Sequence, residues 1–389
     1  MNHTLLHLIG IAIIGAIGVL CNWYVSRRII KPLYGKAGLR GYRIFHLALL
    51  LILGTLACIA NFGGLNNSIA LLVWVMYGFM LFYLPKLCYV IISSIDYLRR
   101  PRGTWAGHIG FVVAAICAVA LIYGAFNRYN IQIKETTITS QRIPSTFDNY
   151  RIVQFSDLHL ETMYSRRYVQ RLVDSINAQQ PDVILFTGDM VNRKASELLQ
   201  YNDILSQLKA ADGVYTVMGN HDYGDFVKWE SEAAHEANLA QLHTLVSDMG
   251  WHLLDNASTY IYRGNDSIAI IGVENWGEPP FQQYGDLAQA YPSLQDDTYK
   301  ILLSHNSRHW RAEVLPHSNI DLTLSGHTHA MQLTICGFSP AIARYPEWGG
   351  LYKEGNQYLY VNIGVGCTMY PARIGATPEI TVITLQSTR

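Results

Sequence analysis

The apolar positions of this chain gather into long runs in its first third and into short runs after it. Four long runs cover about residues 5–24, 44–62, 69–92 and 109–126. Each is close to the roughly 20 residues that a helix needs to cross a bilayer. One such run could be a buried helix of a soluble protein, but four in succession predict a multi-pass membrane domain over residues 1–130.

The charged residues divide at the same place. The chain has 389 residues, with 29 Lys and Arg and 29 Asp and Glu, so its formal net charge is +0. Asp96 is the only acidic residue before residue 127, where ten basic residues also lie. The zero is therefore a cancellation between a basic first part and an acidic second part. No strong attraction to nucleic acid is expected from such a chain.

The basic residues also predict how the membrane domain is oriented. Two loops between the runs carry them, one with Arg27, Arg28, Lys31, Lys36, Arg40 and Arg43, the other with Arg99, Arg100 and Arg102. Because basic loops stay on the cytoplasmic side, we expect a protein of the cytoplasmic (inner) membrane whose large second part is extracytoplasmic. Lys86, late in the third run, is expected to snorkel to the cytoplasmic interface.

After residue 130, short runs rich in β-branched residues alternate with helical patterns. Seven of these runs predict buried strands, at residues 150–156, 183–187, 214–218, 268–273, 300–304, 322–325 and 358–362. Helical spacing covers residues 166–177, behind Ser165 as N-cap, and residues 197–208. This alternation predicts an α/β domain over residues 131–389.

Most of the predicted strands run directly into residues that bind metals. The segments that follow them are Asp157-Leu158-His159, Gly188-Asp189, Gly219-Asn220-His221-Asp222, His305 and Gly326-His327-Thr328-His329. Residues i and i+2 of an extended segment point the same way, so the two members of each Asp-x-His or His-x-His pair can face one site. Each fragment alone is common by chance, whereas five in order, each after a predicted strand, indicate a metal site.

This series resembles the calcineurin-like metallophosphoesterase family, whose pattern is Asp-x-His, Gly-Asp, Gly-Asn-His-Asp/Glu, a lone His and Gly-His-x-His. The resemblance covers roughly residues 131 to 385 and implies a four-layered αββα sandwich with two mixed sheets. It also implies two divalent metal ions, one held by Asp157, His159 and His329, the other by Asn220, His305 and His327, with Asp189 as the bridge. Mixed oxygen and nitrogen donors suit Mn, Fe or Zn.

The resemblance implies a mechanism as well. Two metal ions activate a shared water as hydroxide and stabilise the attacking and leaving oxygens of an in-line displacement. His221 is expected beside the phosphoryl group as a catalytic residue. Asp222 is expected to orient His221 through the other ring nitrogen.

The end of the chain resembles membrane-anchored bacterial members of the family, some of which are similar to UDP-2,3-diacylglucosamine hydrolases. The matching segments are Asn362-Ile363-Gly364-Val365-Gly366, Pro371-Ala372-Arg373 and Pro378-Glu379-Ile380. Arg373 has two interpretations, contact with a substrate phosphate or pairing with Glu379. Ala330-Met331-Gln332 departs from the Gly-Gly-Gln of that branch, which leaves the shape of the adjacent substrate loop open.

Two further questions stay open at the level of sequence. Tyr345, Trp348 and Tyr352 could border the substrate pocket, lie against the bilayer or pack on the domain, and packing is the ordinary case. Cys336 and Cys367 are the only cysteines of the second part. They could form a disulfide in an oxidising compartment, which their spacing does not decide.

The sequence therefore predicts a membrane-bound hydrolase of a phosphodiester, phosphomonoester or pyrophosphate bond, acting on a phosphorylated small molecule or a lipid-linked substrate. A UDP-2,3-diacylglucosamine-type pyrophosphate hydrolase of lipid A biosynthesis is an alternative. The predicted topology opposes it, because such a substrate is expected on the cytoplasmic side. A non-catalytic metal- or ligand-binding receptor is the hypothesis from another class, and the complete set of ligands together with His221 speaks against it.

Overall fold

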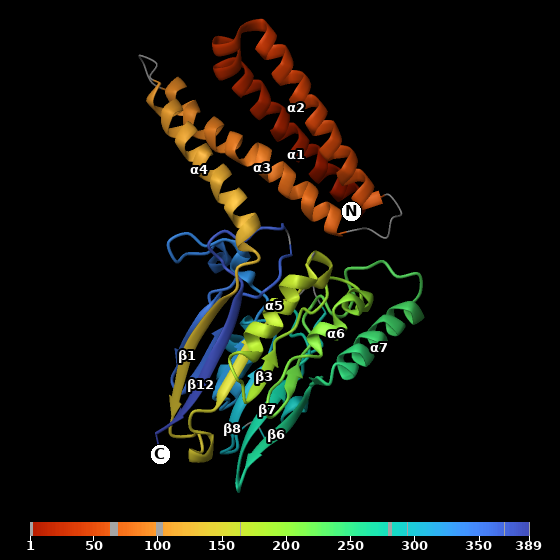
Figure 1. Cartoon of the computed structure of the whole chain (residues 1–389), viewed down its shortest axis with the longest axis vertical. Coiled ribbons are helices and arrows are strands. Elements are labelled where there is room, and N and C mark those ends of the chain that lie inside the picture. The colour runs from red at the N-terminus through yellow and green to blue at the C-terminus, as the bar shows by residue number, and fades with distance from the viewer. Residues whose placement is uncertain are drawn as a thin grey trace. The chain divides into compact units, whose positions relative to one another are not determined.

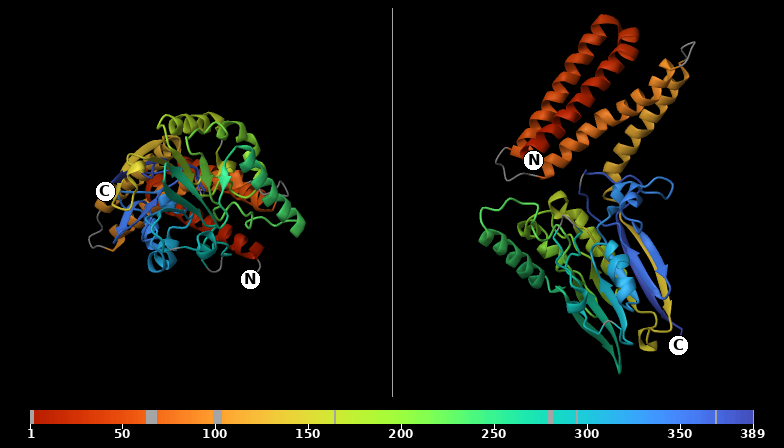
Figure 2. Two further views of the ribbon diagram at one scale, coloured as in Figure 1. Left: turned by 90° about the horizontal axis from the view of Figure 1, so that it is seen from below. Right: turned by 180° about the vertical axis from the view of Figure 1, so that it is seen from behind.

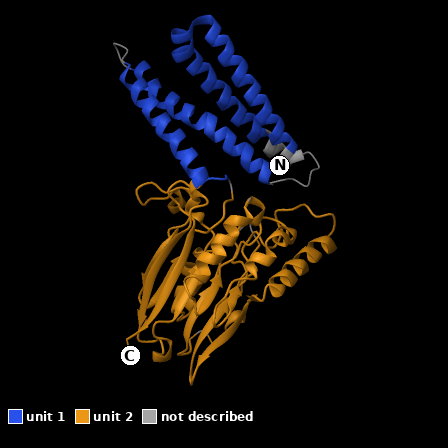
Figure 3. Ribbon diagram, in the orientation of Figure 1, with its two compact units in different colours: residues 1–126, 369–372 blue, residues 127–368, 373–389 orange. Residues whose placement is uncertain are grey.

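The structure is a computed structural model of the chain and describes residues 3–62, 69–98, 104–163, 165–278, 282–293, 295–368 and 370–388. It contains two compact units, residues 1–126 with 369–372 and residues 127–368 with 373–389 (Figure 3). The first unit is helical, and the second contains two sheets with helices on their faces (Figures 1 and 2). The domain boundary at residue 130 stays a prediction.

The first unit is built from long apolar helices. They are α1 (His3–Val25), α2 (Lys31–Phe62), α3 (Ile69–Ser94) and α4 (Trp105–Asn127), with the short turns η1 (Ser26–Ile30) and η2 (Ile95–Tyr97). Helices α1 and α2 run side by side as a hairpin (Figure 1). Within the residues assigned to α2, Gly35 has a non-helical backbone (φ 64°, ψ −157°), a conformation that glycine adopts at little cost.

Three helical stretches of this unit are long and apolar enough to cross a membrane: Ile9–Ile59, Ala70–Tyr97 and Trp105–Asn127. The first has 51 residues and contains both α1 and α2. At about 1.5 Å per residue it is far longer than the roughly 30 Å hydrocarbon core. Four crossings stay a prediction.

The second helix of the membrane domain begins earlier than its apolar run. It was expected at residue 44 but begins at Lys31. The reason is that an apolar run marks the part of a helix suited to lipid, whereas the helix itself continues into polar sequence. The predicted connection at 63–68 and the basic residues Arg99, Arg100 and Arg102 lie outside the described residues.

The second unit contains two mixed six-stranded sheets. Their strand orders are β1-β12-β2-β3-β4-β5 and β10-β11-β9-β8-β7-β6. The first sheet is made of β1 (Gln132–Ser140), β12 (Glu379–Ser387), β2 (Arg151–Phe155), β3 (Val183–Phe186), β4 (Val214–Thr216) and β5 (His252–Leu253). The second is made of β10 (Gly350–Glu354), β11 (Gln357–Val361), β9 (Leu322–Ser325), β8 (Tyr299–Leu303), β7 (Asp266–Gly272) and β6 (Ala257–Arg263). Strands β2 to β5 are parallel, and so are β7, β8, β9 and β11.

Alternate residues of the central strands face opposite sides and build three apolar layers. Ile152 and Ile301 lie in the core between the two sheets. Val153, the neighbour of Ile152, packs instead toward the helices over the first sheet. Leu302, the neighbour of Ile301, packs with Trp310 on the outer face of the second sheet. The predicted α/β fold with two mixed sheets is confirmed.

The helices of this unit agree with the sequence pattern in part. Helix α5 (Arg166–Asn177) has its predicted bounds, and Ser165 caps it by accepting the N–H of Tyr168. The helix predicted at 197–208 is instead a 3-10 segment, η5 (Ala195–Gln200), and a single turn, α6 (Asn202–Leu205), because Tyr201 between them is not helical (φ −127°, ψ −5°). The other helices are α7 (Glu232–Asp248), α8 (Leu287–Ala290), α9 (Leu315–His317), η3 (Ser145–Phe147), η4 (Leu160–Thr162), η6 (Trp310–Val314), η7 (His329–Gln332) and η8 (Pro340–Ala343).

Candidate metal centre

The predicted ligands lie in the loops that follow five parallel strands. In the first sheet these are Asp157 and His159 after β2, Asp189 after β3, and Asn220 after β4; in the second they are His305 after β8, and His327 and His329 after β9. Ligands of α/β proteins gather outside the carboxyl ends of such strands. Here the loops of both sheets supply one site.

Two groups of side chains in this site could hold a metal ion. The first is Asp157, His159, Asp189 and His329, the second is Asp189, His305 and His327, and in each group the ligand atoms lie within 4.8 Å of one another. Oδ2 of Asp189 lies 3.5 Å from Nε2 of His159 and 3.2 Å from Nε2 of His305. Asp189 therefore occupies the position expected of a bridge, and the ligand roles stay predictions.

Polar atoms without partners fit a metal at this place. In the described part of the chain, Oδ1 of Asn220 and Nδ1 of His159 are buried and have no hydrogen-bond partner. A buried acceptor without a donor costs free energy unless a cation or a water satisfies it. Nε2 of His159 also lies 3.0 Å from Nε2 of His329, which lies 3.1 Å from Oδ1 of Asp157. Nitrogen and carboxylate donors converging in this way suit Mn, Fe or Zn.

Backbone strain marks the same residues. Positive φ angles between 48° and 72° occur at Asp157, His159, Asp189, His327 and His329. Residues other than glycine adopt this region rarely, and such outliers cluster at functional sites. Glycine is also required beside the carboxylates, because a Cβ on Gly219 would lie 2.2 Å from Oδ1 of Asp189.

Burial and neighbouring charges oppose each other in the site. Burial raises the pKa of Asp157 and Asp189, but the surrounding imidazoles, His329 for Asp157 and His305 for Asp189, outweigh burial and hold both pKa values below the ordinary range. Burial, followed by the nearby His305, lowers the pKa of His327 to about 3. For His305, burial is outweighed by Asp189 and Asp157, which raise the pKa to about 9. The carboxylates therefore stay ionised, as a site for cations requires.

His221 lies beside the ligands but is not oriented by Asp222, which corrects the prediction. The ring centroids of His221 and His159 are 4.9 Å apart, and Nδ1 of His221 lies 2.8 Å from the carbonyl oxygen of Asn192. The carboxylate of Asp222 is fully engaged with backbone. It accepts N–H groups of Asp189, Met190, Val191 and Gly219 at 2.8 to 3.1 Å. Asp222 thus fixes the loops after β3 and β4.

Arg373 fits neither of its two predicted roles. Its side chain is 0% exposed, so it does not face a pocket open to substrate. It donates to the carbonyl oxygens of Gly366, Ile363 and Ala376, and Nη2 lies 3.1 Å from Nδ1 of His329. Glu379 pairs instead with Lys134, at 2.6 Å. Arg373 holds the closing segment against the ring of a candidate ligand.

A pocket of about 160 Å³ opens beside the second group of ligands. It is lined by Asn220, Asn275, Trp276, Gly277, Glu278, Asn306, His327, Arg344 and Tyr345. The Tyr345 hydroxyl lies 2.8 Å from Nε2 of His327, so Tyr345 borders the pocket. Trp348 packs instead near Ile363 and Ala376. The pattern of the sequence did not indicate Asn275, Glu278, Asn306 or Arg344, since single polar loop residues carry no signal.

The loop after His329 has a backbone conformation that favours glycine, although its residues are Ala330, Met331 and Gln332. Ala330, Met331 and Gln332 all have positive φ, between 48° and 56°. Glycine would take this conformation without strain, whereas Ala330 and Met331 store some. Gln332 helps to hold the loop, because its side-chain oxygen accepts the N–H of Thr368 at 2.7 Å.

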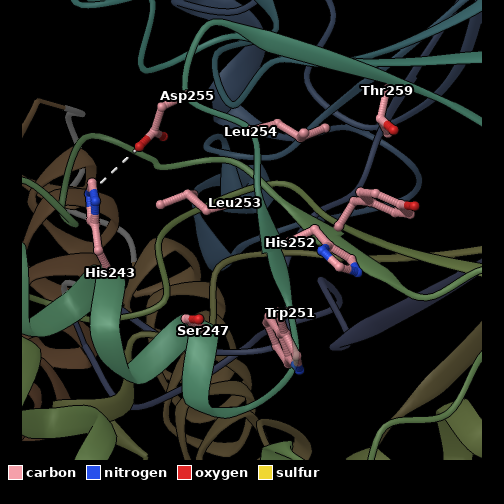
Figure 4. Close-up of a pocket in the computed structure, with 9 residues that line it drawn as sticks. His243, Ser247, Trp251, His252, Leu253, Leu254, Asp255 and Thr259 are labelled. Atoms are coloured by element: carbon pink, nitrogen blue, oxygen red, sulfur yellow. Dashed lines mark ion pairs between the residues drawn. The ribbon is translucent and has the colours of Figure 1, made fainter.

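A larger pocket lies elsewhere in the second unit. It has a volume of about 520 Å³, is lined by residues of β4, α7, β5 and β6, and includes Trp251 and His252 (Figure 4). His243 and Asp255 form an ion pair at its edge, with 3.6 Å between Nε2 and Oδ2. None of the predicted ligands lines this pocket, so size alone does not identify the active site.

The cysteines settle one open question. Cys336 is exposed, Cys367 is buried, and both are free thiols. The structure therefore contains no disulfide between these two described residues.

Fold and site together define a class of protein: an α/β domain that gathers His, Asp and Asn at the carboxyl ends of parallel strands, joined to apolar helices of membrane-spanning length. Residues 150–331 match the family described as "Calcineurin-like phosphoesterase", and residues 7–128 match "Probable Calcineurin-like phosphoesterase, transmembrane domain". This chain belongs to the calcineurin-like phosphoesterase family.

Two relatives are named for a metallophosphoesterase, and one of them is also named as a transmembrane protein. The uncharacterized metallophosphoesterase YkuE of Bacillus subtilis (strain 168) is 32% identical over 270 residues, which are 66% of this chain and 86% of YkuE. The transmembrane protein with metallophosphoesterase domain of Danio rerio is 29% identical over 282 residues, 70% of this chain and 61% of that protein. This chain thus spans less than two thirds of the fish protein. The predicted family, its class of phosphoester hydrolases and the membrane association are confirmed.

Proposed function

We propose that this protein is a membrane-bound phosphoesterase that uses two divalent ions, Mn, Fe or Zn, to hydrolyse a phosphodiester, phosphomonoester or pyrophosphate bond. The observation that carries the proposal is the carboxylate of Asp189, which belongs to both groups of ligands. Two ions bound in such a site would lower the pKa of a bound water and would neutralise negative charge on the transferring phosphoryl group.

His221 is the proposed proton donor to the leaving oxygen. A carbonyl oxygen only accepts, so the 2.8 Å contact with Asn192 places a hydrogen on Nδ1 of His221. Nε2 is then the nitrogen that takes up or releases a proton. Phe226 stacks on the ring at 4.6 Å and keeps it beside His159.

The substrate we propose is a lipid-linked phosphate. The membrane unit of the same chain supports this, because it brings the hydrolase to substrates that do not leave the bilayer. The pocket of about 160 Å³ beside Asn220 and His327 suits a phosphoryl group and the first atoms of its substituent. The rest of a larger substrate would lie outside it.

The side of the membrane is proposed from the basic loops, as extracytoplasmic for the catalytic domain. A reporter that folds only in an oxidising compartment, fused after residue 389, is expected to be active. Activity only of a cytoplasmic reporter would reverse the topology, and would favour the UDP-2,3-diacylglucosamine-type pyrophosphate hydrolase.

The enzyme itself is tested with the full chain in detergent, assayed with Mn, Fe(II) or Zn against bis(p-nitrophenyl) phosphate and p-nitrophenyl phosphate. Asp189→Asn should reduce turnover by about 10⁴-fold, because charge compensation worth several kcal/mol is lost. Asp203→Asn is the matched control, since Asp203 is 64% exposed and pairs with Arg166. Absence of turnover with all three ions, together with intact metal binding, would replace the proposal by the non-catalytic receptor.

A further inference from the structure

Five polar side chains converge inside the helical unit. They are Asn22 of α1, Tyr42 and His46 of α2, and Tyr83 and Lys86 of α3, and we call them the intramembrane polar cluster. Nζ of Lys86 lies 2.9 Å from Oδ1 of Asn22 and 3.0 Å from Nε2 of His46. Tyr42 donates to the same oxygen of Asn22 at 3.2 Å. Lys86 was expected to snorkel to the cytoplasmic interface, and in the structure its ammonium is held by side chains of α1 and α2.

The cluster carries a cation that no described carboxylate balances. Lys86 faces the Asn22 oxygen and the rings of Tyr83 and Tyr42, whose centroids are 4.7 and 5.5 Å from Nζ. The one acidic residue in this part of the sequence, Asp96, accepts hydrogen bonds from Arg28 and from the N–H groups of Ala106 and Gly107. An ammonium at membrane depth without an anionic partner is costly and usually marks a functional site.

The cluster also has more hydrogen-bond donors than acceptors. An ammonium offers three hydrogens, an amide two and a phenol one. Oδ1 of Asn22 accepts from Lys86 and Tyr42, and the Tyr83 oxygen accepts from Nδ2 of Asn22 at 3.4 Å. Among the described residues no acceptor faces the Tyr83 hydroxyl hydrogen, although this side chain is only 1% exposed. Spare donors around a positive charge suit the oxygens of an anion.

An apolar groove of about 470 Å³ lies between the same three helices. Its lining includes Gly10 and Gly15 of α1, Leu50 and Gly54 of α2, and Phe79 and Met80 of α3. A Cβ on Gly10, Gly15 or Gly54 would meet no atom within 4 Å, so these glycines leave space. Phe79 stacks on Tyr83 with 4.6 Å between ring centroids, which joins the wall of the groove to the cluster.

The groove and the cluster are close along the helices. His46 precedes Leu50 by one turn, and Lys86 follows Met80 by less than two turns, so roughly 6–9 Å of helix separates them. A hydrocarbon chain fits the groove, and an anionic head group fits the cluster. A molecule with both parts would contact the groove and the cluster at the same time.

We propose that the intramembrane polar cluster and the apolar groove form one binding site for a phosphate-bearing lipid. The phosphate oxygens accept from Lys86, His46 and Tyr83, and one alkyl chain lies in the groove. The site belongs to the helical unit and does not depend on the phosphoesterase activity proposed above.

The probe for this site is dodecylphosphonic acid, whose carbon–phosphorus bond is not a phosphoester. It is titrated calorimetrically into the full chain, purified in dodecyl maltoside and treated with EDTA. We expect one molecule per chain, and at least about tenfold weaker binding in Lys86→Met, which loses a charged hydrogen bond. Gly54→Leu fills the groove and should weaken binding similarly. Lys31→Met is the matched control, because Lys31 is an exposed lysine of α2, and it should keep the affinity.

The other outcomes are decisive as well. Asp189→Asn should bind the probe as the unmodified chain does, whereas loss of binding there would place the phosphonate at the metal centre. Methylphosphonate has no alkyl chain. If it bound with equal affinity, the site would recognise phosphate alone, and the proposal that it binds a lipid would be overturned. Tyr83→Phe removes one hydroxyl only, so unchanged binding in this variant and in Gly54→Leu would overturn the proposal even if Lys86→Met does not fold.

Discussion

The two units of this chain bury opposite kinds of charge. In the second unit, Asp157 and Asp189 are ionised carboxylates surrounded by imidazoles. In the first unit, Lys86 is a cation surrounded by an amide, an imidazole and two phenols. One cluster offers acceptors and the other offers donors. In both units the buried groups around a site therefore indicate the charge of the ligand that would complete it. A cluster of acceptors suits a cation, and a cluster of donors suits an anion.

The two clusters are also built differently. The metal centre stands on loops after strands, and five of its seven predicted ligands have positive φ angles, so it stores strain that a bound ion can offset. The intramembrane polar cluster stands on regular helices, and none of its five described members has a positive φ angle. The metal centre should therefore gain more stability from its ligand than the polar cluster does.

The largest effect that separates the clusters is expected from His305→Ala. This change removes one member of the second group and leaves Asp189 without its 3.2 Å neighbour. We expect about one ion per chain instead of two by elemental analysis, and turnover lower by about 10⁴-fold. Binding of dodecylphosphonic acid should not change. Two ions per chain in this variant would show that His305 is not a ligand.

His221→Ala is expected to have the next largest effect. Loss of a proton donor should lower kcat by about 10²-fold at unchanged metal content, because the ring holds no position in either group of ligands. His317→Ala, at an exposed histidine, is the matched control. A parallel loss of metal would instead make His221 part of the metal centre.

Sequence predicted the parts of this site that depend on local spacing. Asp157 with His159, and His327 with His329, were expected together because alternate residues of an extended segment face one side. Each pair does lie in one site, but all four residues have positive φ angles, so the turns of the loops after β2 and β9 bring them together and not strand geometry. Asn192 was missed because it acts through its carbonyl oxygen, which every residue has. The function of Asp222 was predicted wrongly, since residue type shows a carboxylate but not which donors the folded loops present to it.

The same limit applies to the membrane unit. Periodicity predicted apolar helices but not which of their faces meet, so Lys86 was assigned to the interface. Its contacts with Asn22 and His46 join residues that are 64 and 40 positions away. Pairings of that kind are decided by packing in three dimensions, which a single sequence does not specify.

Tyr345→Phe should have a smaller effect, on metal affinity rather than on the chemical step. The hydroxyl holds Nε2 of His327, whose Nδ1 lies 3.2 Å from His305. Loss of a contact that orients a ligand typically weakens metal binding by about tenfold. Competitive titration against a metal-binding dye measures this directly. Tyr352 is another tyrosine near the same loop, and its hydroxyl accepts the N–H of Trp348 at 3.2 Å. Tyr352→Phe is therefore the control and should leave the affinity unchanged.

The smallest effect tests the assumption behind the comparison, that a buried charge without sufficient compensation lowers stability. Burial raises the pKa of Asp255 to about 6, with His243 opposing it. The folded state therefore holds this proton more tightly than the unfolded state, whose carboxyl has a pKa of about 4. The contribution of Asp255 to stability is present below pH 4 and is lost as the pH rises to 6.

The Asn side chain imitates the neutral carboxyl at every pH. Asp255→Asn should therefore have a higher Tm than the unmodified chain at pH 7.5, and the difference in Tm should be smaller at pH 4.5. The side chain is 29% exposed, which limits the effect to about 1–2 kcal/mol. Asp203→Asn, at the 64% exposed position, should give a difference in Tm that does not change with pH. A pH-independent difference for Asp255→Asn as well would mean that water reaches this carboxylate, and that burial alone is a weak guide to which charges of this chain need a ligand.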